Sequence, residues 1–270
     1  GVLLAGSLAI SSCNLEEVRP IMREKIAVIA DDAYATLQFD MNDEEIDNWN
    51  VSSVGGRETN RKPFDAPCAN VSYEPSTRTL TIDFGTTGCV GKDGKKRQGK
   101  IVHVYSQDRK VETTTLIDYF VDGNKVEGTR VRTWVNGRPP IGKTLEVKLS
   151  SGKITFTDGT TLTLEGSWTR TISLAQGELT TETGSCSGKT RKDIHYNSTI
   201  EKPLVRKTAC FTQKIPYIVE GIRKVTLHDG KQSTIIMIDY GNGECDNKAT
   251  VTINGKTREI ELGSRYNGND

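Results

Sequence analysis

The sequence predicts an all-β protein: an antiparallel meander of two related halves, preceded by one short N-terminal helix. Three observations lead to this prediction. From about residue 67, runs rich in Thr, Val, Ile and aromatic residues alternate between apolar and polar positions, as strands with one buried face do. Turn-forming residue pairs separate these runs. No helical stretch long enough for a crossover follows residue 67, which argues against a parallel sheet.

The predicted turns consist of residue pairs that readily accept a positive φ angle. Short connections of this kind make consecutive strands antiparallel neighbours. We therefore expect a sandwich, a partial barrel or an elongated curved sheet. The turn pairs are Asp122-Gly123, Asn136-Gly137, Ser151-Gly152, Asp158-Gly159, Gln176-Gly177, Asp229-Gly230 and Asn254-Gly255.

A helix is predicted from about Pro20 to Leu37, because apolar residues recur there at steps of three and four. These residues are Met22, Ile26, Ile29, Ala33 and Leu37. We expect the helix to pack on an edge of the sheet through this stripe. Residues 40–66 are predicted to form a polar connector. Within it, the acidic run 40–45 lacks the glycine and the distal glutamate of a calcium loop, so we expect a solvated loop.

An internal repeat is visible in the first and last thirds of the β region. The stretches 81–89 and 238–245 both read Ile-Asp-aromatic-Gly, followed by Gly and Cys, with the same spacing from Asp to Cys. We interpret them as two copies of one structural unit, within residues 67–106 and 203–262. The β region is accordingly predicted to comprise a first half, 67–150, and a second half, 151–270.

In each copy of the repeat, another cysteine stands a few tens of residues before the cysteine of the motif. We therefore predict the disulfides Cys68–Cys89 and Cys210–Cys245 among the six cysteines of the chain. Each would stabilise the fold by about 3–4 kcal/mol in the chain-entropy view. Two alternatives remain open: buried free thiols that pack as small apolar groups, and pairing between the copies.

The N-terminal residues are predicted to be an export signal. Residues 1–10 are apolar but far shorter than the roughly 20 residues that span a bilayer. They end in Leu8-Ala9-Ile10-Ser11-Ser12-Cys13, which resembles the lipobox of bacterial lipoproteins. On this interpretation residues 1–12 belong to a signal peptide truncated at its start, and residues 13–66 form a lipidated N-terminus, helix and connector. A short buried helix or strand is the alternative.

The prediction that follows is an outer-membrane lipoprotein, attached to the membrane by an acyl chain on Cys13 and facing the periplasm or the cell surface. The acidic residues that follow Cys13, Glu16 and Glu17, are similar to the surface-export signal of Bacteroides-like lipoproteins.

The repeat itself carries a family resemblance. Together with the stretches 119–129, 203–207 and 239–249, it resembles an uncharacterised family of lipoproteins from Bacteroides-like bacteria, over roughly residues 65–262. The resemblance implies export and lipid anchoring. It implies no catalytic residue.

Two motifs suggest chemistry but lack the required context. Cys186 lies in Gly-Ser-Cys-Ser-Gly, the pattern of a nucleophile elbow, but no helical stripe follows it in residues 189–200. We therefore expect a spare thiol beside a flexible turn. Residues 137–144 fit the P-loop pattern, but Pro139 and Pro140 lack backbone N–H groups and residues 145–149 alternate as a strand. No nucleotide is expected.

The charge balance also limits the function. A net charge of +1 favours neither nucleic acid nor anionic lipid. His103, His195 and His228 have no second ligand at metal-binding spacing, so no metal or other cofactor is expected. The basic run 92–100 is typical of a wet hairpin, with binding of acidic glycan or lipopolysaccharide as the alternative.

These observations predict a binding or scaffold module at the cell envelope, without catalysis, whose partner would be a glycan or an envelope protein. The alternative is a surface glycan-binding accessory lipoprotein. For that function, exposed Trp134 or Trp168 would stack on a sugar ring.

Overall fold

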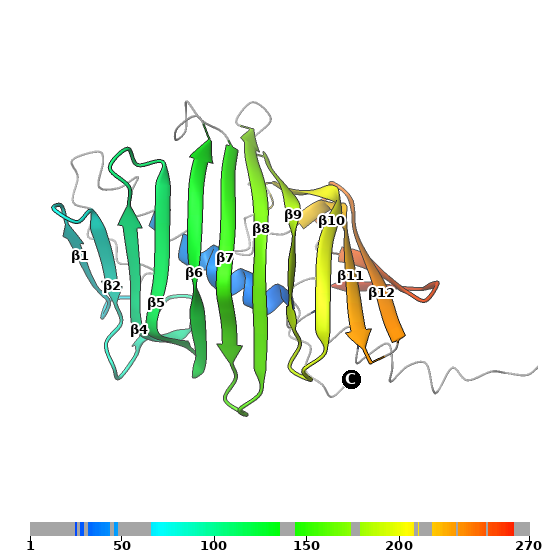
Figure 1. The fold of residues 1–270 in the computed structure, drawn as a ribbon, viewed down its shortest axis with the longest axis horizontal. Coiled ribbons are helices and arrows are strands. Elements are labelled where there is room, and N and C mark those ends of the chain that lie inside the picture. Colours follow the sequence, from blue (N-terminus) through cyan, green and yellow to red (C-terminus); the bar gives the residue numbers. More distant parts are fainter. Residues whose placement is uncertain are drawn as a thin grey trace, which may run out of the picture.

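The strands of this protein form one antiparallel sheet in which consecutive strands are neighbours (Figure 1). The computed structural model describes residues 25, 28–29, 32–43, 46–47, 66–135, 144–173, 179–207, 210, 218–230, 232–246 and 248–261. The strand order is β1-β2-β4-β5-β6-β7-β8-β9-β10-β11-β12-β13-β14, and β3 pairs with β4 beside this path. The predicted antiparallel meander with one preceding helix is therefore confirmed.

The strands lengthen toward the middle of the sheet and shorten toward its two edges. The first seven are β1 (Asn70–Glu74), β2 (Thr79–Asp83), β3 (Cys89–Val90), β4 (Lys96–Tyr105), β5 (Val111–Val121), β6 (Asn124–Val135) and β7 (Thr144–Thr155). The second seven are β8 (Thr161–Ser173), β9 (Leu179–Lys189), β10 (His195–Lys207), β11 (Ile218–Asp229), β12 (Gln232–Asn242), β13 (Lys248–Ile253) and β14 (Lys256–Glu261).

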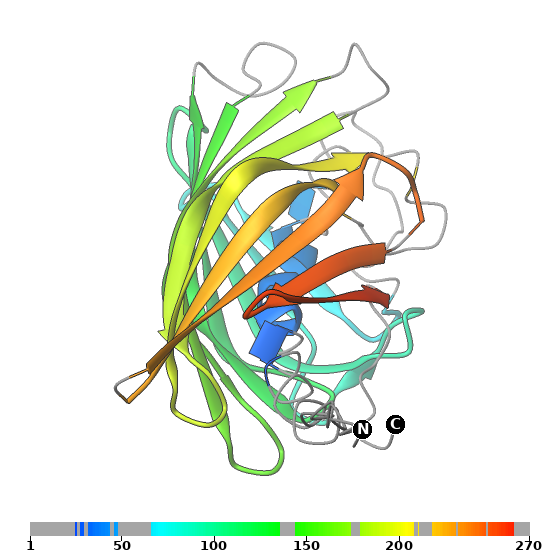
Figure 2. The same cartoon turned by 90° about the vertical axis from the view of Figure 1, so that its right-hand side faces the viewer.

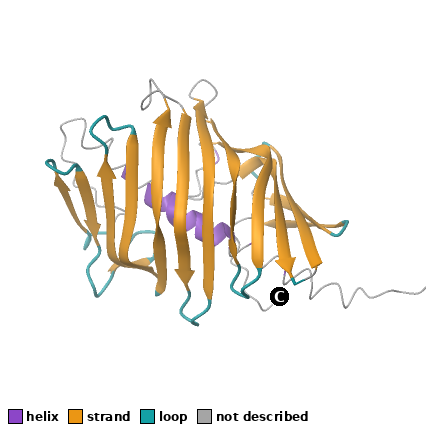
Figure 3. Ribbon diagram, in the orientation of Figure 1, coloured by secondary structure: helices purple, strands orange, loops and turns teal. Residues whose placement is uncertain are grey.

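The sheet is strongly curved, and the N-terminal helix lies inside the curve (Figure 2). Seen from the other direction, the helix crosses behind the middle strands rather than following one of them (Figure 3). It lies against the concave face, so the prediction that it packs on a sheet edge is wrong. The helix covers a face that arginine side chains line, as described below, and an acidic helix is attracted to such a face.

The helix also extends further than predicted. Its described residues are 25, 28–29, 32–43 and 46–47, so the expected solvated loop at residues 40–45 is wrong where it is described. Asp40 and Asp43 are helical and turned into the protein. The buried face contains Ala35, Phe39 and Ile46. Ala33, part of the predicted apolar stripe, is exposed instead.

Alternate residues of the strands point into the curve and form the core. In the middle of the sheet, Leu149, Leu162 and Leu164 are almost completely buried. Trp134 and Trp168 belong to the same inward set, each with 6% of its surface exposed. Stacking on a sugar at the surface requires an exposed ring, so these two residues cannot play the role predicted for them.

The pair Ser151-Gly152 does not form the predicted hairpin turn. It lies within β7, where the register with β6 and β8 shifts and Ser151 has a φ of 53°. This is a β-bulge, which bends the strand and increases its twist. A Cβ atom on Gly152 would lie 2.3 Å from the backbone oxygen of Leu164, so the bend requires glycine here. The predicted boundary between residues 150 and 151 therefore falls inside a strand of one continuous sheet.

The two repeat copies have the same local structure at opposite ends of the sheet. Asp83 Oδ1 accepts a hydrogen bond from the N–H of Gly85 at 2.9 Å, and Asp239 Oδ1 accepts one from Gly241 at 3.0 Å. Both glycines have a positive φ angle, and Phe84 and Tyr240 beside them are buried. The repeated segment begins at the end of β2 in the first copy and forms the last residues of β12 in the second.

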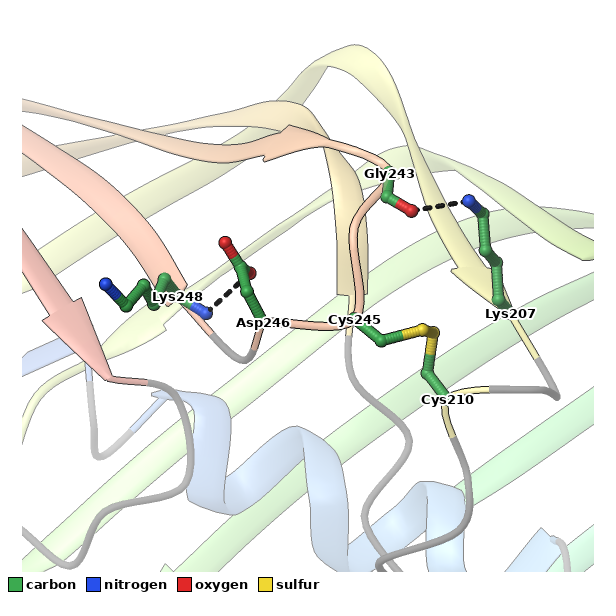
Figure 4. The surroundings of a disulfide bond; sticks show 6 residues. All are labelled: Lys207, Cys210, Gly243, Cys245, Asp246 and Lys248. Atoms are coloured by element: carbon green, nitrogen blue, oxygen red, sulfur yellow. Dashed lines mark hydrogen bonds between the residues drawn. A yellow bond between two sulfur atoms is a disulfide. The ribbon is translucent and has the colours of Figure 1, made fainter.

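Both predicted disulfides are present. Cys68 is bonded to Cys89 and Cys210 to Cys245, and each bond joins the chain before a hairpin to the chain after it. Figure 4 shows the second bond, where Lys207 donates to the carbonyl oxygen of Gly243 and Asp246 accepts from the backbone N–H of Lys248. The disulfides therefore fasten the hairpins β1–β2 and β11–β12.

Candidate functional site

Buried charged side chains gather at the interface between the helix and the concave face. Asp40 Oδ1 accepts hydrogen bonds from Nη2 of Arg130 at 2.7 Å and of Arg170 at 2.8 Å. Its Oδ2 accepts one from Arg206 Nη1 at 3.3 Å. These arginines come from β6, β8 and β10, so one helical carboxylate joins three strands that are distant in sequence.

Two further carboxylates among the described residues of the helix have similar partners. Asp32 accepts from Tyr196 at 2.8 Å and from Arg223 at 3.0 Å. Asp47 accepts two hydrogen bonds from Arg132, both at 2.8 Å. Asp32, Asp40, Asp43 and Asp47 are spaced by eight, three and four residues, which places them on one side of the helix.

Carboxylates of the sheet complete this network. Glu112 accepts from Arg132 and, at 3.0 Å, from the indole N–H of Trp134. His103 Nε2 lies 3.6 Å from the same carboxylate, and His103 Nδ1 lies 2.8 Å from Thr114 Oγ1. Glu182 accepts from Arg170 Nε at 2.5 Å. The concave face thus carries its own counter-charges beside those of the helix.

Burial and charge act in opposite directions on these groups. Burial alone would raise the pKa of Asp40, but Arg170, Arg130 and Arg206 hold that pKa far below its usual range. Glu182 shows the same balance: burial raises its pKa, and Arg170 and Arg206 lower it further than burial raises it. Both carboxyl groups are therefore ionised at neutral pH.

These ion pairs fasten the helix to the sheet, and the helix covers the concave face. Asp43 is held only by ion pairs: its Oδ2 lies 2.9 Å from Arg130 Nε and its Oδ1 lies 3.8 Å from Arg132 Nε, without hydrogen-bond geometry. Removing one member would leave buried charges without a partner, which is costly. We therefore assign these residues a structural role.

Cys186 is not placed for catalysis. It lies in the middle of β9, not beside a turn as predicted, and has 8% of its surface exposed. Burial raises the pKa of its thiol to about 12, and Asp32 raises it as well. A reactive cysteine needs a lowered pKa and access to solvent. The expected strand after it is confirmed, because β10 begins at His195.

The outer face of the same strands carries a shallow, open hollow of about 720 Å³. We call it the outer hollow. Its side chains alternate with buried ones along β7 to β11, so they point away from the helix. They include Lys153, Glu165, Ser187, His195, Asn197 and His228. Hydroxyl, amide, imidazole and ammonium groups therefore surround an open space.

The polar groups of the outer hollow are partly held by one another. Asn197 Nδ2 lies 2.9 Å from His228 Nε2, and Ser233 Oγ lies 3.3 Å from His228 Nδ1. Glu165 accepts a hydrogen bond from the backbone N–H of Ser151 at 2.8 Å, at the bulge of β7. These contacts orient the side chains toward the solvent without burying them.

Several predicted sites lie outside the described residues. These are Cys13 and the proline-containing part of the P-loop pattern, residues 137–143. The strand predicted after that pattern is present as β7. Among the described residues, no three His, Cys, Asp or Glu side chains gather in an arrangement that would hold a metal ion. In the same part of the chain, no helix has the length and apolar character needed to cross a membrane.

Comparison with family models, with curated proteins and with solved structures finds no match for this chain. The function must therefore be argued from the chain's own residues.

Neither the charged interface of the helix nor the outer hollow was predicted from the sequence. The spacing of the four helical aspartates would have revealed an acidic stripe on one helix face, and Arg130 and Arg132 stand at alternate positions of one strand. No comparable signal marks the outer hollow, because its residues are ordinary outward positions of five strands.

Proposed function

We propose that this chain is an exported, lipid-anchored protein that acts as a binding or scaffold module at the cell envelope, without catalysis. The two disulfides carry this proposal, because such bonds persist in oxidising compartments and are rare in the cytosol. The lipobox-like segment before Cys13 supplies the means of attachment.

The distribution of charged groups supports binding rather than turnover. The helix occupies the concave face, and the ionised groups there are paired with one another. The described cysteine without a disulfide, Cys186, is buried with a raised pKa. The outer hollow offers hydrogen-bonding groups without an activated nucleophile, which suits a surface that holds a partner.

A second candidate function is that of a surface glycan-binding accessory protein. The polar lining of the outer hollow favours it, since sugars are bound through hydroxyl, amide and imidazole groups. The tryptophans first considered for this role are buried, so the sugar would be held by hydrogen bonds instead of by ring stacking.

Metabolic labelling tests the proposal. The chain is expressed in a Bacteroides-like bacterium behind an initiator Met and a short basic segment, and the cells are fed an alkyne fatty acid. We expect label on the wild type and on a Cys186→Ala control, and none on Cys13→Ala. We also expect the labelled protein in the outer-membrane fraction. A wild-type chain that stays unlabelled, or that remains in the cytosol, would contradict the proposal.

A further inference from the structure

We propose that the outer hollow is a binding site for an acidic oligosaccharide, a chain of sugars that carry carboxylate or sulfate groups. This inference rests on the proposed function, because it assumes that the outer face meets the polysaccharides of the envelope.

The shape of the outer face suits an extended ligand. A second hollow of about 590 Å³ adjoins the first, and the two share Glu165, Ser187 and Asn197. Together they form a continuous open trough across β7 to β11. A compact cofactor would be enclosed by its pocket, whereas an oligosaccharide chain can lie along such a trough with one side in solvent.

The lining of the trough suits a ligand rich in hydroxyl groups. Ser, Thr, Asn and His side chains both donate and accept hydrogen bonds, as each hydroxyl group of a sugar also does. Ser187, Asn197 and His195 come from neighbouring strands β9 and β10, so their polar groups stand side by side. The exposed large apolar side chains of the described residues are Val90, Val104, Val111, Ile117 and Ile235, none of which lines the trough.

The charges of the trough favour an anionic sugar. Lys148, Lys153 and Lys189 line it, against one carboxylate, Glu165. Glu165 already accepts a hydrogen bond from the backbone at the bulge. Lys189 forms an exposed ion pair with Asp193 at 2.7 Å, which leaves Lys148 and Lys153 as the cations we assign to the ligand. Two lysines beside a row of hydroxyl groups would pair with carboxylate or sulfate groups along a sugar chain.

The floor of the trough is built from central strands of the sheet, which fixes the positions of the side chains that would contact the ligand. β8, β9 and β10 are each paired on both sides, so no edge strand forms the floor. Gly166 of β8 lines the second hollow, and a Cβ atom at this position would lie 2.6 Å from the Cβ atom of Cys186 on β9. Its neighbours are therefore in close contact, and the side chains of the trough are presented by a fixed backbone. A preorganised surface loses less entropy when it binds.

Isothermal titration calorimetry with purified protein tests the proposal, with oligogalacturonate as the acidic probe and maltooligosaccharide as the neutral one. We expect the wild type to bind the acidic probe, and added salt to weaken that binding because exposed charges are screened. Lys153→Glu and Asn197→Ala should each raise the Kd about tenfold, which corresponds to about 1.4 kcal/mol. Lys256→Glu makes the same charge change at the start of β14, outside the trough, and should leave the Kd unchanged.

Each result decides for or against the trough. Weaker binding by Lys153→Glu and Asn197→Ala, but not by Lys256→Glu, would support it. Equal binding by all variants would place the sugar elsewhere, and equal binding of the neutral probe would refute the role of charge. No binding of the acidic probe would overturn the inference and favour a protein partner. Lipid labelling of Cys13 is measured separately, so the proposed function can stand while this inference fails.

Discussion

The two faces of the same sheet differ in whether their charged side chains are buried and paired or exposed to water. Along β10, Tyr196 and Arg206 point inward and contact carboxylates of the helix, whereas His195 and Asn197 point outward and line the hollow. On the concave face, most of the charged groups are buried, and the ionised carboxylates of Asp40 and Glu182 depend on their arginine partners. On the outer face the charged groups are exposed to water, and their ion pairs, such as Lys189 with Asp193, lie at the surface. This difference separates residues that determine the fold from residues that are free to meet a ligand, and it ranks the effects of mutation.

The largest effect is expected for Asp40→Asn. The substitution keeps the shape of the side chain but leaves Arg130, Arg170 and Arg206 without their shared carboxylate. Breaking a buried ion pair on one side costs about 3–5 kcal/mol. We expect the free energy of unfolding, measured by urea denaturation at pH 7, to fall by about that amount.

The matched control is Asp118→Asn, which removes the same charge from a side chain that is 82% exposed. Exposed ion pairs contribute about 0–1 kcal/mol, so the control should unfold like the wild type. If Asp40→Asn proved as stable as Asp118→Asn, the helix would not be held by its charges.

A smaller loss is expected when the disulfides are removed. Cys68 and Cys89 are 21 residues apart in sequence, and Cys210 and Cys245 are 35 apart. In the chain-entropy model each bond contributes about 3 kcal/mol, with slightly more for the longer loop. The double variants Cys68→Ser/Cys89→Ser and Cys210→Ser/Cys245→Ser should each lose that amount in urea denaturation. Cys186→Ser serves as the cysteine control. Should wild-type stability be insensitive to a reductant, the bonds would not fasten the sheet.

The sequence was sufficient for the parts of the fold that depend on local chemistry. Alternation predicted the strands, and Gly-containing pairs predicted turns such as Asp122-Gly123 and Asn254-Gly255, which have positive φ angles in the structure. The repeat predicted both disulfides, because each pair of cysteines lies within one copy. All these features are set by residues close together in the chain.

The position of the helix and the outer hollow depend on contacts between distant residues. Asp40 and Arg170 are 130 positions apart, and nothing near either of them predicts the other. Of the predicted apolar stripe, Ala33 is exposed and Ile29 packs against the core. The buried aspartates were not predicted, since burial of an aspartate is costly until its arginine partners are known. The Ser151-Gly152 pair was misread for a related reason: the same residues suit a turn and a bulge, and only the neighbouring strands decide.

Acid should weaken the concave face. The folded-state pKa values of Asp40 and Glu182 are lowered, mainly because nearby arginines outweigh burial. Such groups stabilise the fold above their unfolded pKa values, near 4, and lose that contribution as the pH falls through the folded values. The free energy of unfolding should therefore decrease steadily from about pH 5 downward. Asp40→Asn should show a shallower decrease. If the free energy of unfolding of the wild type and of Asp40→Asn decreased in parallel with falling pH, Asp40 would not be the source of the acid sensitivity.

The thiol of Cys186 tests burial of the concave face without altering it. Its pKa is raised to about 12 by burial, so little thiolate forms at pH 8. We expect iodoacetamide to modify Cys186 slowly in the folded protein and rapidly in urea, as followed by mass spectrometry. The disulfide-bonded cysteines should remain unmodified under both conditions. Fast modification of the folded protein would show that the middle of β9 is accessible.

The smallest effect on stability is expected for the outer hollow, and this makes it a sharp test of the comparison. Lys153 is exposed on β7, directly beside the buried Ile154. Reversing its charge in Lys153→Glu alters only groups in water, where screening keeps pairwise energies small. The free energy of unfolding should change by less than about 0.5 kcal/mol, while binding of oligogalacturonate falls about tenfold. A loss of stability comparable to that of Asp40→Asn would mean that both faces hold the fold, and that the outer face is not free to act as a binding surface.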